Sequence, residues 1–215
     1  MTGLTGARSS GRRLRELYNR LLKEYGPQGW WPVKGKYRPG VFRPRTGEEC
    51  FEIAAGALLT QNTNWGNAAR ALEGLRAARL LSPRCIIRAP LPKLEKAIRP
   101  AGYYRQKAGR LKGLAKAYLS LNARMGTEEL RERLLAVKGV GEETADSILL
   151  YAYGRPVFVI DAYTKRICEK EKLFKGKTYS EYQRFFEGNL PRKAELFNEF
   201  HALIVEWNKR ERRKL

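Results

Sequence analysis

The sequence predicts an all-α fold, and three observations support this class. Apolar residues recur at spacings of three and four in about ten separate segments, as they do on the buried face of amphipathic helices. No two segments alternate apolar and polar residues as paired strands would, and the one β-like run, Val157–Ile160, is short and solitary. The chain has 215 residues, 43% of them hydrophobic, which suits one compact domain or two closely joined lobes.

The N-terminal part is predicted to hold a helix followed by a long loop. Residues 1–13 are rich in Gly, Ser and Arg and are expected to be loose, and a helix should run over residues 14–25. Residues 28–49 contain three prolines and four glycines and read as a loop. Its Trp30-Trp31-Pro32 sequence must pack somewhere, either into the core or as a stacking wall for a base or sugar.

A buried helix is expected over residues 51–62, and its C-terminal end is unusually rich in amide and hydroxyl side chains. We call Thr60–Asn64 the amide loop, and Trp65 follows it directly. Such a cluster serves in capping and turn formation, or as a finger that fills the gap left when a base leaves a duplex. Further helices are predicted over residues 67–78, from Ser82, and over 91–98 and 104–121. In the last of these, Lys107, Arg110 and Lys112 face either phosphate or solvent.

Two helices joined by a tight hairpin are predicted over about residues 130–153. Gly139 and Gly141 can adopt backbone angles that a β carbon would forbid, so the chain can reverse within a few residues. Thr127 is the expected N-cap of the first helix. The free N–H groups at the start of the second helix form a natural seat for a phosphate, and Lys138 adds a positive charge.

A lone acidic residue, Asp161, directly follows the Val157–Ile160 run. As a structural residue it would be the N-cap of the next predicted helix, residues 163–172. Facing a cleft, an ionised carboxylate would stabilise a sugar cation and orient a water molecule. Helices over residues 179–186 and 194–209 complete the chain.

The balance of charge points to a polyanionic partner. The chain has 43 Lys and Arg against 22 Asp and Glu, a net charge of +21, and nucleic acid is the simplest partner for such a surface. The three cysteines, Cys50, Cys85 and Cys168, have neither disulfide nor metal-ligand spacing and suit a reducing compartment. The single histidine, His201, is expected to be an ordinary, partly buried side chain. No apolar run is long enough for a membrane span or a signal segment.

At this point several motifs resemble one family. Val137 to Gly141 with Thr144-Ala145, followed by Val159-Ile160-Asp161 and Arg166, is similar to the helix-hairpin-helix and catalytic aspartate of the endonuclease III superfamily of DNA glycosylases. The segment from Phe51 to Thr63 is similar to that family's first barrel helix and intercalating loop. The resemblance implies a two-lobed fold divided into residues 1–50, 51–161 and 162–215. It assigns catalysis to Asp161, intercalation to Gln61 and Asn62, and phosphate binding to Lys138, Gly139, Val140, Gly141 and Thr144.

Two departures from the family pattern narrow the expected activity. Bifunctional members have a lysine nucleophile two residues after the second glycine, where this chain has Glu143, and a carboxylate cannot form an imine. After Asp161 only Cys168 remains, so the four-cysteine iron–sulfur cluster of many relatives is not expected. No other cofactor is implied, apart from a monovalent cation at the hairpin.

One branch of the family, the 3-methyladenine DNA glycosylase III type, combines both departures, and the chain resembles it. There the residues matching Trp30, Trp31, Pro32, Trp65 and Lys209 surround the flipped base, although the insert between Pro32 and Phe51 differs from the branch. The resemblance implies a monofunctional glycosylase for alkylated purines in double-stranded DNA. It further implies a monomer without a membrane partner in the prokaryotic cytoplasm, at the nucleoid. The alternatives are a mismatch thymine or uracil glycosylase, an oxidised-pyrimidine glycosylase with lyase activity, and a non-catalytic DNA-binding module.

Overall fold

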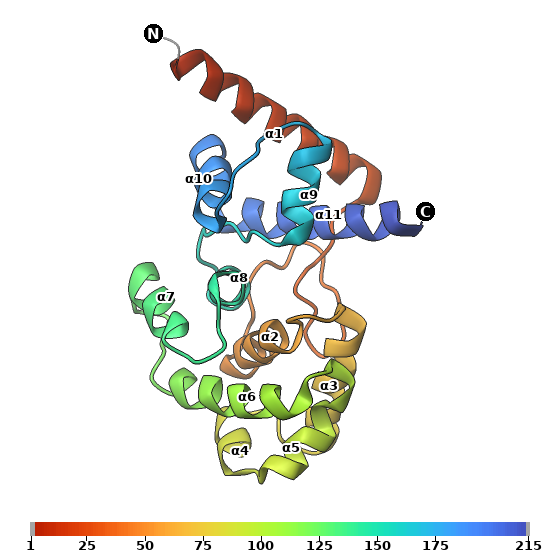
Figure 1. Ribbon diagram of the computed structural model, residues 1–215, viewed down its shortest axis with the longest axis vertical. Coiled ribbons are helices and arrows are strands. Elements are labelled where there is room, and N and C mark those ends of the chain that lie inside the picture. The colour runs from red at the N-terminus through yellow and green to blue at the C-terminus, as the bar shows by residue number, and fades with distance from the viewer. Residues whose placement is uncertain (1–2, 214–215) are drawn as a thin grey trace. The chain divides into compact units, whose positions relative to one another are not determined.

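The computed structural model describes residues 3–213, and the side chains of residues 9–212. Eleven α-helices, α1 to α11, a 3-10 turn η1 and a π-helical turn η2 make up its regular structure within that range (Figure 1). The only β pairing among these residues is an isolated bridge between Val33 and Lys36. The predicted all-α class is therefore confirmed. No helix in the described part of the chain has the length and hydrophobicity needed to cross a membrane.

Contacts divide the chain into two units. Unit 1 comprises residues 1–31, 37–42 and 154–215, and unit 2 comprises residues 32–36 and 43–153. Unit 1 thus joins N-terminal and C-terminal segments, with boundaries at residues 42–43 and 153–154 where the sequence suggested 50–51 and 161–162. Pro32 belongs to unit 2, whereas Trp30 and Trp31 belong to unit 1.

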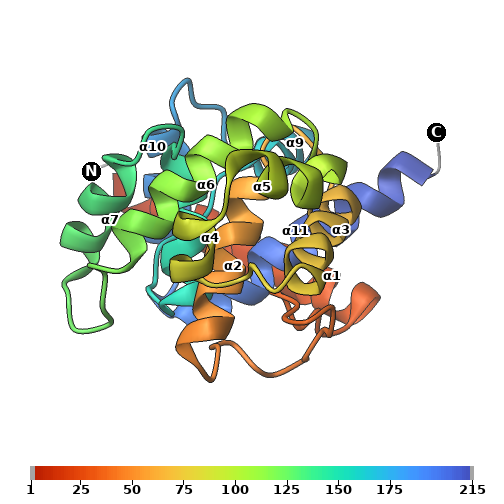
Figure 2. The same ribbon diagram turned by 90° about the horizontal axis from the view of Figure 1, so that it is seen from below.

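Unit 2 is built around α2, whose residues 51–59 are all buried. The helix begins at Gly47, earlier than the predicted residue 51, because Thr46 caps it by accepting a hydrogen bond from the Glu49 N–H at 3.2 Å. Figure 2 shows α4 and α5 beside α6, in agreement with the contacts that each of them makes with α6. The elements of unit 2 are α2 (Gly47–Leu59), α3 (Trp65–Ala77), α4 (Pro83–Arg88), α5 (Leu91–Ile98), η1 (Arg99–Ala101), α6 (Tyr104–Tyr118), α7 (Thr127–Leu135), α8 (Glu142–Ser147) and η2 (Ile148–Ala152).

Two lysines of α6, Lys107 and Lys112, donate hydrogen bonds to backbone carbonyl oxygens within unit 2. This structural role contrasts with the phosphate-facing role considered for them. Lys107 is 2% exposed, and its Nζ donates to the carbonyl oxygens of Leu59 at 2.9 Å and Ala101 at 2.7 Å. Lys112 donates to the carbonyl oxygen of Ile87 at 2.7 Å. Burial, helped by the nearby charge of Arg110, lowers the pKa of Lys107 to about 8. Lys107 therefore ties the end of α2 to η1.

We expect Lys107 to make stability depend on pH. Between the folded pKa of about 8 and the ordinary value of 10.5, the unfolded chain binds more protons, so the free energy of unfolding rises with pH. From pH 8 to pH 10, the free energy of unfolding of the wild type should rise by about 1–3 kcal/mol relative to that of Lys107→Met. Urea unfolding at several pH values measures it. Parallel curves for the two proteins would show that Lys107 titrates normally.

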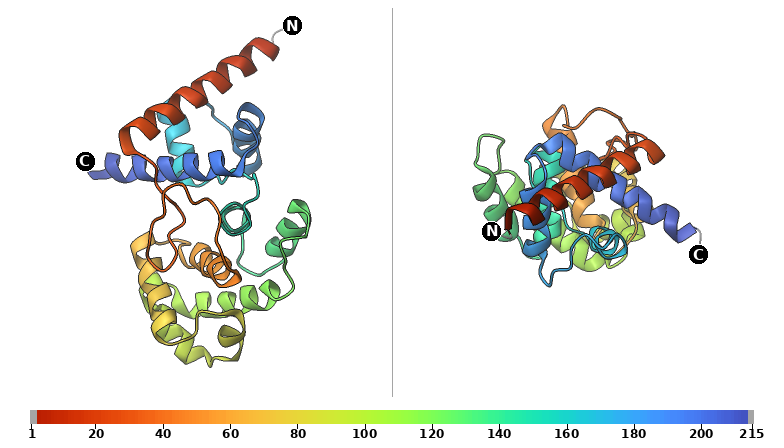
Figure 3. Two further views of the ribbon diagram at one scale, coloured as in Figure 1. Left: turned by 180° about the vertical axis from the view of Figure 1, so that it is seen from behind. Right: turned by 90° about the horizontal axis from the view of Figure 1, so that it is seen from above.

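Unit 1 packs its helices around an aromatic core. The Phe158 ring stacks on Phe186 with centroids 4.1 Å apart, and Phe197 and Phe200 meet it edge-on at 5.3 and 5.9 Å. Figure 3 shows α1 crossing α11, and Tyr18 on α1 contacts Phe200 at 5.4 Å. The helices of unit 1 are α1 (Gly3–Tyr25), α9 (Ala162–Lys170), α10 (Tyr179–Asn189) and α11 (Ala194–Arg213).

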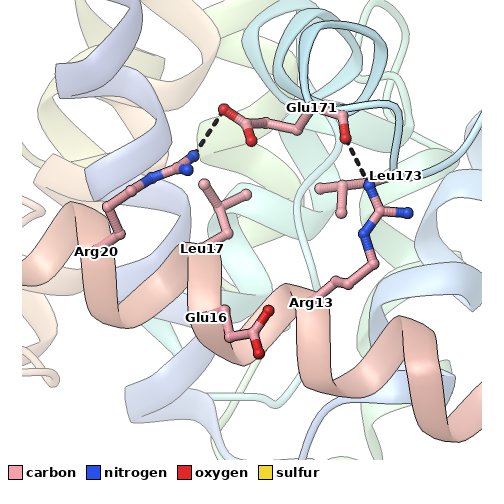
Figure 4. A pocket seen from close by; sticks show the side chains of 6 residues that line it. All are labelled: Arg13, Glu16, Leu17, Arg20, Glu171 and Leu173. Carbon is pink, nitrogen blue, oxygen red and sulfur yellow. Dashed lines mark hydrogen bonds and ion pairs between the residues drawn. The ribbon is translucent and has the colours of Figure 1, made fainter.

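The prediction that residues 1–13 are loose is wrong for residues 3–13, which extend α1. Tertiary contacts stabilise this glycine-containing segment. A β carbon at Gly11 would lie 2.9 Å from the Asn189 carbonyl oxygen, so glycine permits a close approach to α10. Arg13 donates to the Glu171 carbonyl oxygen at 2.7 Å, and Arg20 pairs with the Glu171 carboxylate at 2.6 Å, beside a pocket of about 200 Å³ (Figure 4).

Candidate functional site

The segment that carries Asp161 is extended but has no neighbouring strand. Side chains of α10 satisfy its backbone instead. The Phe158 N–H donates to Glu187 at 2.8 Å, the Phe158 carbonyl oxygen accepts from Gln183 at 2.9 Å, and the Ile160 N–H donates to the Tyr179 hydroxyl at 3.3 Å. These α10 residues are four apart and share one helical face. A row of side chains thus fixes the backbone that leads to Asp161.

Asp161 is the N-cap of α9, and the cap uses only one of its two carboxylate oxygens. Oδ1 accepts from the Thr164 N–H at 2.7 Å and the Thr164 hydroxyl at 2.9 Å. Oδ2 lies 3.5 Å from Nε2 of His201 on α11, and the Asp161 side chain is 13% exposed. Because the two oxygens have different neighbours, capping and a chemical role are compatible at this residue.

The surroundings of Asp161 keep it ionised. Burial alone would raise its pKa, but the charge of His201 and the hydrogen bonds from His201 and Thr164 outweigh burial and lower the pKa below its ordinary value. A largely enclosed carboxylate with a lowered pKa carries its negative charge throughout the neutral range. It is suited to electrostatic stabilisation of a cation.

An aromatic cluster in unit 1 contains three of the five predicted pocket residues. Trp30 lies 5.2 Å from Trp31 and 5.8 Å from Tyr37, measured between ring centroids. The Lys209 ammonium lies 5.5 Å from the Trp30 ring centre, within cation–π range, and 3.5 Å from the Glu206 carboxylate. Trp30, Trp31 and Lys209 are therefore together. The other two predicted residues, Pro32 and Trp65, belong to unit 2, where Trp65 begins α3.

The hairpin of unit 2 connects α7 to α8, as the sequence predicts, but its glycines serve different purposes. Gly139 has φ of +88° and needs to be glycine, whereas Gly141 has an ordinary φ of −97° as the N-cap of α8. Of the two glycines, only Gly139 uses the backbone freedom that the sequence offers at both positions. Its β-carbon position is open space, so glycine leaves room for a ligand to approach the backbone. Lys138 is exposed, and the side chains of Val140 and Thr144 are buried.

A buried ion pair fastens the two helices of this motif to each other. Arg131 on α7 binds Asp146 on α8 through two hydrogen bonds of 2.7 and 3.1 Å, and the Asp146 side chain is fully buried. Arg131 also lies 3.5 Å from Glu142. The expected N-cap at Thr127 is wrong: Gly126 occupies that position, without a side-chain cap, and Thr127 is the first helical residue. After α8 the chain widens into the π-helical turn η2.

The two predicted intercalating residues lie in different surroundings within unit 2. Gln61 is half-buried and bonds to the hairpin, donating to the Gly139 carbonyl oxygen and to the Thr144 hydroxyl, both at 2.9 Å. Asn62 is exposed and adopts a φ of +52°. The family resemblance implies one role for both residues, and only the structure shows that their surroundings differ.

Sequence reasoning missed two candidate functional residues. His201 was expected to be an ordinary histidine, and its contact with Asp161 spans 40 positions in the sequence, which no local pattern signals. Tyr103 is 67% exposed and has a φ of +46°, rare for a bulky side chain. It occupies the N-cap position of α6, without a side-chain cap, two residues after Ala101, which Lys107 ties to the end of α2. An exposed, constrained aromatic ring there is a candidate for stacking on a base.

The cysteines are separate thiols. Cys50 is half-buried, Cys85 is exposed and Cys168 is buried. Among the residues that the structure describes, no group of three or more His, Cys, Asp or Glu is arranged to hold a metal ion.

Comparison with known proteins finds a matching family and several relatives. A family model described as "HhH-GPD superfamily base excision DNA repair protein" matches residues 55–192. A Methanocaldococcus jannaschii protein, provisionally named a DNA repair glycosylase, is 42% identical over 210 residues, which cover 93% of this chain and 88% of that protein. Endonuclease III of Sulfolobus acidocaldarius is 28% identical over 163 residues, covering 74% of this chain and 73% of that enzyme.

A solved structure agrees with this assignment. The crystal structure of the H. pylori 3-methyladenine DNA glycosylase MagIII bound to 1,N6-ethenoadenine is similar with a TM-score of 0.74 and 31% identity. The similarity covers 94% of this chain and 98% of that one. The family model matches more than half of the chain, and the hairpin and the capped aspartate lie within the matched range. The chain therefore belongs to the HhH-GPD superfamily of base excision DNA repair proteins.

Proposed function

We propose that this DNA glycosylase is monofunctional and removes N-alkylated purines, such as 3-methyladenine, from double-stranded DNA by hydrolysis. The observation that carries the proposal is the environment of Asp161, a carboxylate held ionised with one oxygen fixed by Thr164 and the other beside His201. The product is an abasic site with the DNA backbone intact.

Asp161 supplies what cleavage of a sugar–base bond needs. As the bond between C1′ and the base nitrogen breaks, its electron pair leaves with the base and positive charge develops on the sugar. A fixed carboxylate stabilises that charge, because its position requires no reorganisation during the reaction. A water oxygen then bonds to C1′, and its proton is released. We assign to Asp161 both the stabilisation of the cation and the orientation of this water.

The proposed base pocket is aromatic and is built on Trp30, Trp31 and Lys209 of unit 1. The pocket roles of Pro32 and Trp65 stay predictions of the family resemblance. Alkylated purines such as 3-methyladenine are cationic, so their sugar bond is already weakened and an aromatic face attracts them. The positive charge of Lys209 would oppose a cationic base, but Glu206 lies 3.5 Å from it and balances that charge. The similarity to the H. pylori enzyme supports this substrate class.

The proposed DNA grip is the hairpin, Lys138 to Gly141 with Thr144, acting through backbone N–H groups and the Lys138 charge. Contacts of this kind bind phosphate without reading the base sequence. The affinity of the protein for duplex DNA should therefore fall steeply as salt rises. The proposed binding form is a monomer.

The proposed reaction requires no cofactor. The whole chain has three cysteines, so it cannot supply the four thiolates of an iron–sulfur cluster of the family type. A monovalent cation at the hairpin stays a prediction. Backbone carbonyl oxygens are suitable ligands, but those of Val137 and Gly139 already accept hydrogen bonds.

A base-release panel tests the proposed activity. Duplexes containing 3-methyladenine, 7-methylguanine, hypoxanthine, uracil, or thymine opposite guanine are incubated with the protein, and free bases and strand breaks are both measured. We expect release of the methylated purines, and strand breaks only after hot alkali. No covalent complex should be trapped by borohydride, because Glu143 replaces the lyase lysine.

Other outcomes of the panel would favour the alternatives. Release of thymine or uracil instead of methylated purines would identify a mismatch glycosylase. Strand breaks without alkali, or borohydride trapping, would overturn the monofunctional assignment. Binding without release of any base would leave the non-catalytic DNA-binding module.

We expect His201 to control the pH dependence of the reaction. Excision needs ionised Asp161 and fails as the pH drops through the pKa of Asp161. In His201→Leu, burial is no longer opposed by the histidine charge, so this pKa rises. Excision by the variant should fall more at pH 5.5 than at pH 8, relative to wild type, whereas His201→Gln, which retains an N–H donor, should be less affected. An equal loss at both pH values would indicate a purely structural role for His201.

A further inference from the structure

The two glycines of the hairpin have different surroundings. The β-carbon position of Gly141 is open space, whereas a β carbon on Gly139 would lie 2.4 Å from Cδ and 2.5 Å from Nε of Arg110. The Arg110 side chain, which comes from α6, therefore lies directly against the backbone of Gly139. Glycine is needed at position 139 for this contact as well as for the φ of +88°.

The guanidinium of Arg110 is held at the hairpin but uses few of its donors there. Its Nη1 donates to the Gln61 side-chain oxygen at 3.3 Å. The Gln61 nitrogen in turn donates to the Gly139 carbonyl oxygen and to the Thr144 hydroxyl, both at 2.9 Å. Because a guanidinium carries several N–H donors in a fork, one long hydrogen bond to Gln61 leaves most of them for a further acceptor.

The positive charge of Arg110 has no acidic partner among the residues that the structure describes. It lies close enough to another cation, Lys107, to help lower the pKa of that lysine. The carboxylates of Glu142 and Asp146 lie by Arg131 instead, at 3.5 and 2.7 Å. Like charges without a counter-charge repel each other, and an anion bound at Arg110 would relieve this repulsion.

The hairpin backbone provides hydrogen-bond donors but little positive charge of its own. The N–H groups of Gly139 and Gly141 donate to no backbone carbonyl oxygen in the described part of the chain. Residues 138–143 contain one lysine and two glutamates, so their own charge does not attract a phosphate. Arg110 supplies a positive charge from a different helix and places it at Gly139.

We propose that Arg110 is a phosphate-binding residue, whose guanidinium and the N–H groups of the hairpin bind the same phosphate of the DNA backbone. The arginine fork can donate parallel hydrogen bonds to phosphate oxygens. The absence of a β carbon at Gly139 lets the guanidinium and the backbone converge on one anion. This inference rests on the proposed function, because it requires that the hairpin holds a phosphate.

The salt dependence of DNA binding tests this assignment without base release. Fluorescence anisotropy measures the affinity for a labelled, undamaged duplex over a range of salt concentrations. Arg110→Met keeps an apolar stem against Gly139 and removes the charge. The slope of log affinity against log salt should become less steep by about 0.9, the value for one lost phosphate contact. The affinity itself should fall by at least about fivefold.

Two further variants separate the phosphate contact from other effects. Arg110→Lys keeps the charge but loses the fork, so it should bind more weakly than wild type with a slope close to the wild-type value. Lys116→Met is the matched control, because it removes the same charge from an exposed position of α6. Its affinity and its slope should remain close to those of wild type. Circular dichroism verifies that each variant is folded.

Two results would overturn the proposal. A wild-type slope in Arg110→Met, even with a lower affinity, would show that Arg110 only supports Gln61 and the hairpin. An equal change of slope in Lys116→Met would show that the effect comes from the net charge of the protein.

Gly141→Val distinguishes a failure of this proposal from a failure of the proposed hairpin grip. Its side chain would fill the open space over the backbone, at a φ of −97° that valine can adopt. If Gly141→Val weakens binding and Arg110→Met keeps its slope, the grip stands and the role of Arg110 is wrong. If Gly141→Val binds like wild type, the hairpin holds no phosphate and the shared site is refuted. Failure of the glycosylase activity would not affect these measurements, because they release no base.

Discussion

Asp161→Asn should lower the single-turnover rate of base release by at least about a thousandfold, while binding to duplex DNA persists or becomes tighter. The substitution replaces the negative charge that stabilises the sugar cation with a neutral amide of the same shape. Asparagine caps helices as well as aspartate does, so Thr164 keeps an acceptor and α9 should retain its start. Base release from dimethyl-sulfate-treated DNA and gel-shift titration are the two measurements.

The chain provides an internal control for this experiment, since it has only one other aspartate, Asp146. Asp146→Asn removes the same charge from a buried residue that we place in the support of the hairpin. It should reduce stability and DNA affinity, but the rate of base release at saturating protein should remain far above that of Asp161→Asn. Retention of near-wild-type release by Asp161→Asn would remove the catalytic role from Asp161 and favour the DNA-binding module.

Arg131→Leu should lower the free energy of unfolding by about 3–5 kcal/mol, because it removes the positive charge that pairs with the buried carboxylate of Asp146. The Arg131 side chain is 22% exposed and that of Asp146 is fully buried, so solvent offers little compensation. Urea unfolding followed by circular dichroism measures the loss. The hairpin should also lose affinity for undamaged duplex, because α7 and α8 are no longer fastened to each other.

The double variant Arg131→Leu with Asp146→Leu separates the loss of the pair from the burial of one charge. Replacing both partners by apolar side chains removes the buried carboxylate together with its arginine, so much of the stability should return. A loss below about 1 kcal/mol for Arg131→Leu alone would show that the pair behaves as an exposed surface pair does.

Much of the local structure follows from the sequence, because it depends on neighbours within one or two helical turns. Apolar spacing predicts most of the helices, and Gly139 predicts the reversal between α7 and α8, where a φ of +88° requires glycine. The N-cap role of Asp161 is equally local, since its partner Thr164 is three residues away. The candidate site residues could be named from such patterns and from the family resemblance.

Contacts between residues far apart in the sequence determine the features that sequence patterns do not predict. Lys107 looks like a surface lysine in a basic helix, yet it is buried against the carbonyl oxygens of Leu59 and Ala101. The Val157–Ile160 run has the composition of a strand, but the side chains of α10 satisfy its backbone and no strand forms there.

The sequence by itself determined the helical class, the hairpin and the position of the capping carboxylate. Only the tertiary structure placed His201 beside Asp161 and joined Gln61 to the hairpin 78 residues away. The physical reason is that propensity and capping act over a few residues along the chain. The charge state of Asp161 and the hydrogen bonds of Gln61 depend instead on polar groups that become neighbours only when the helices pack.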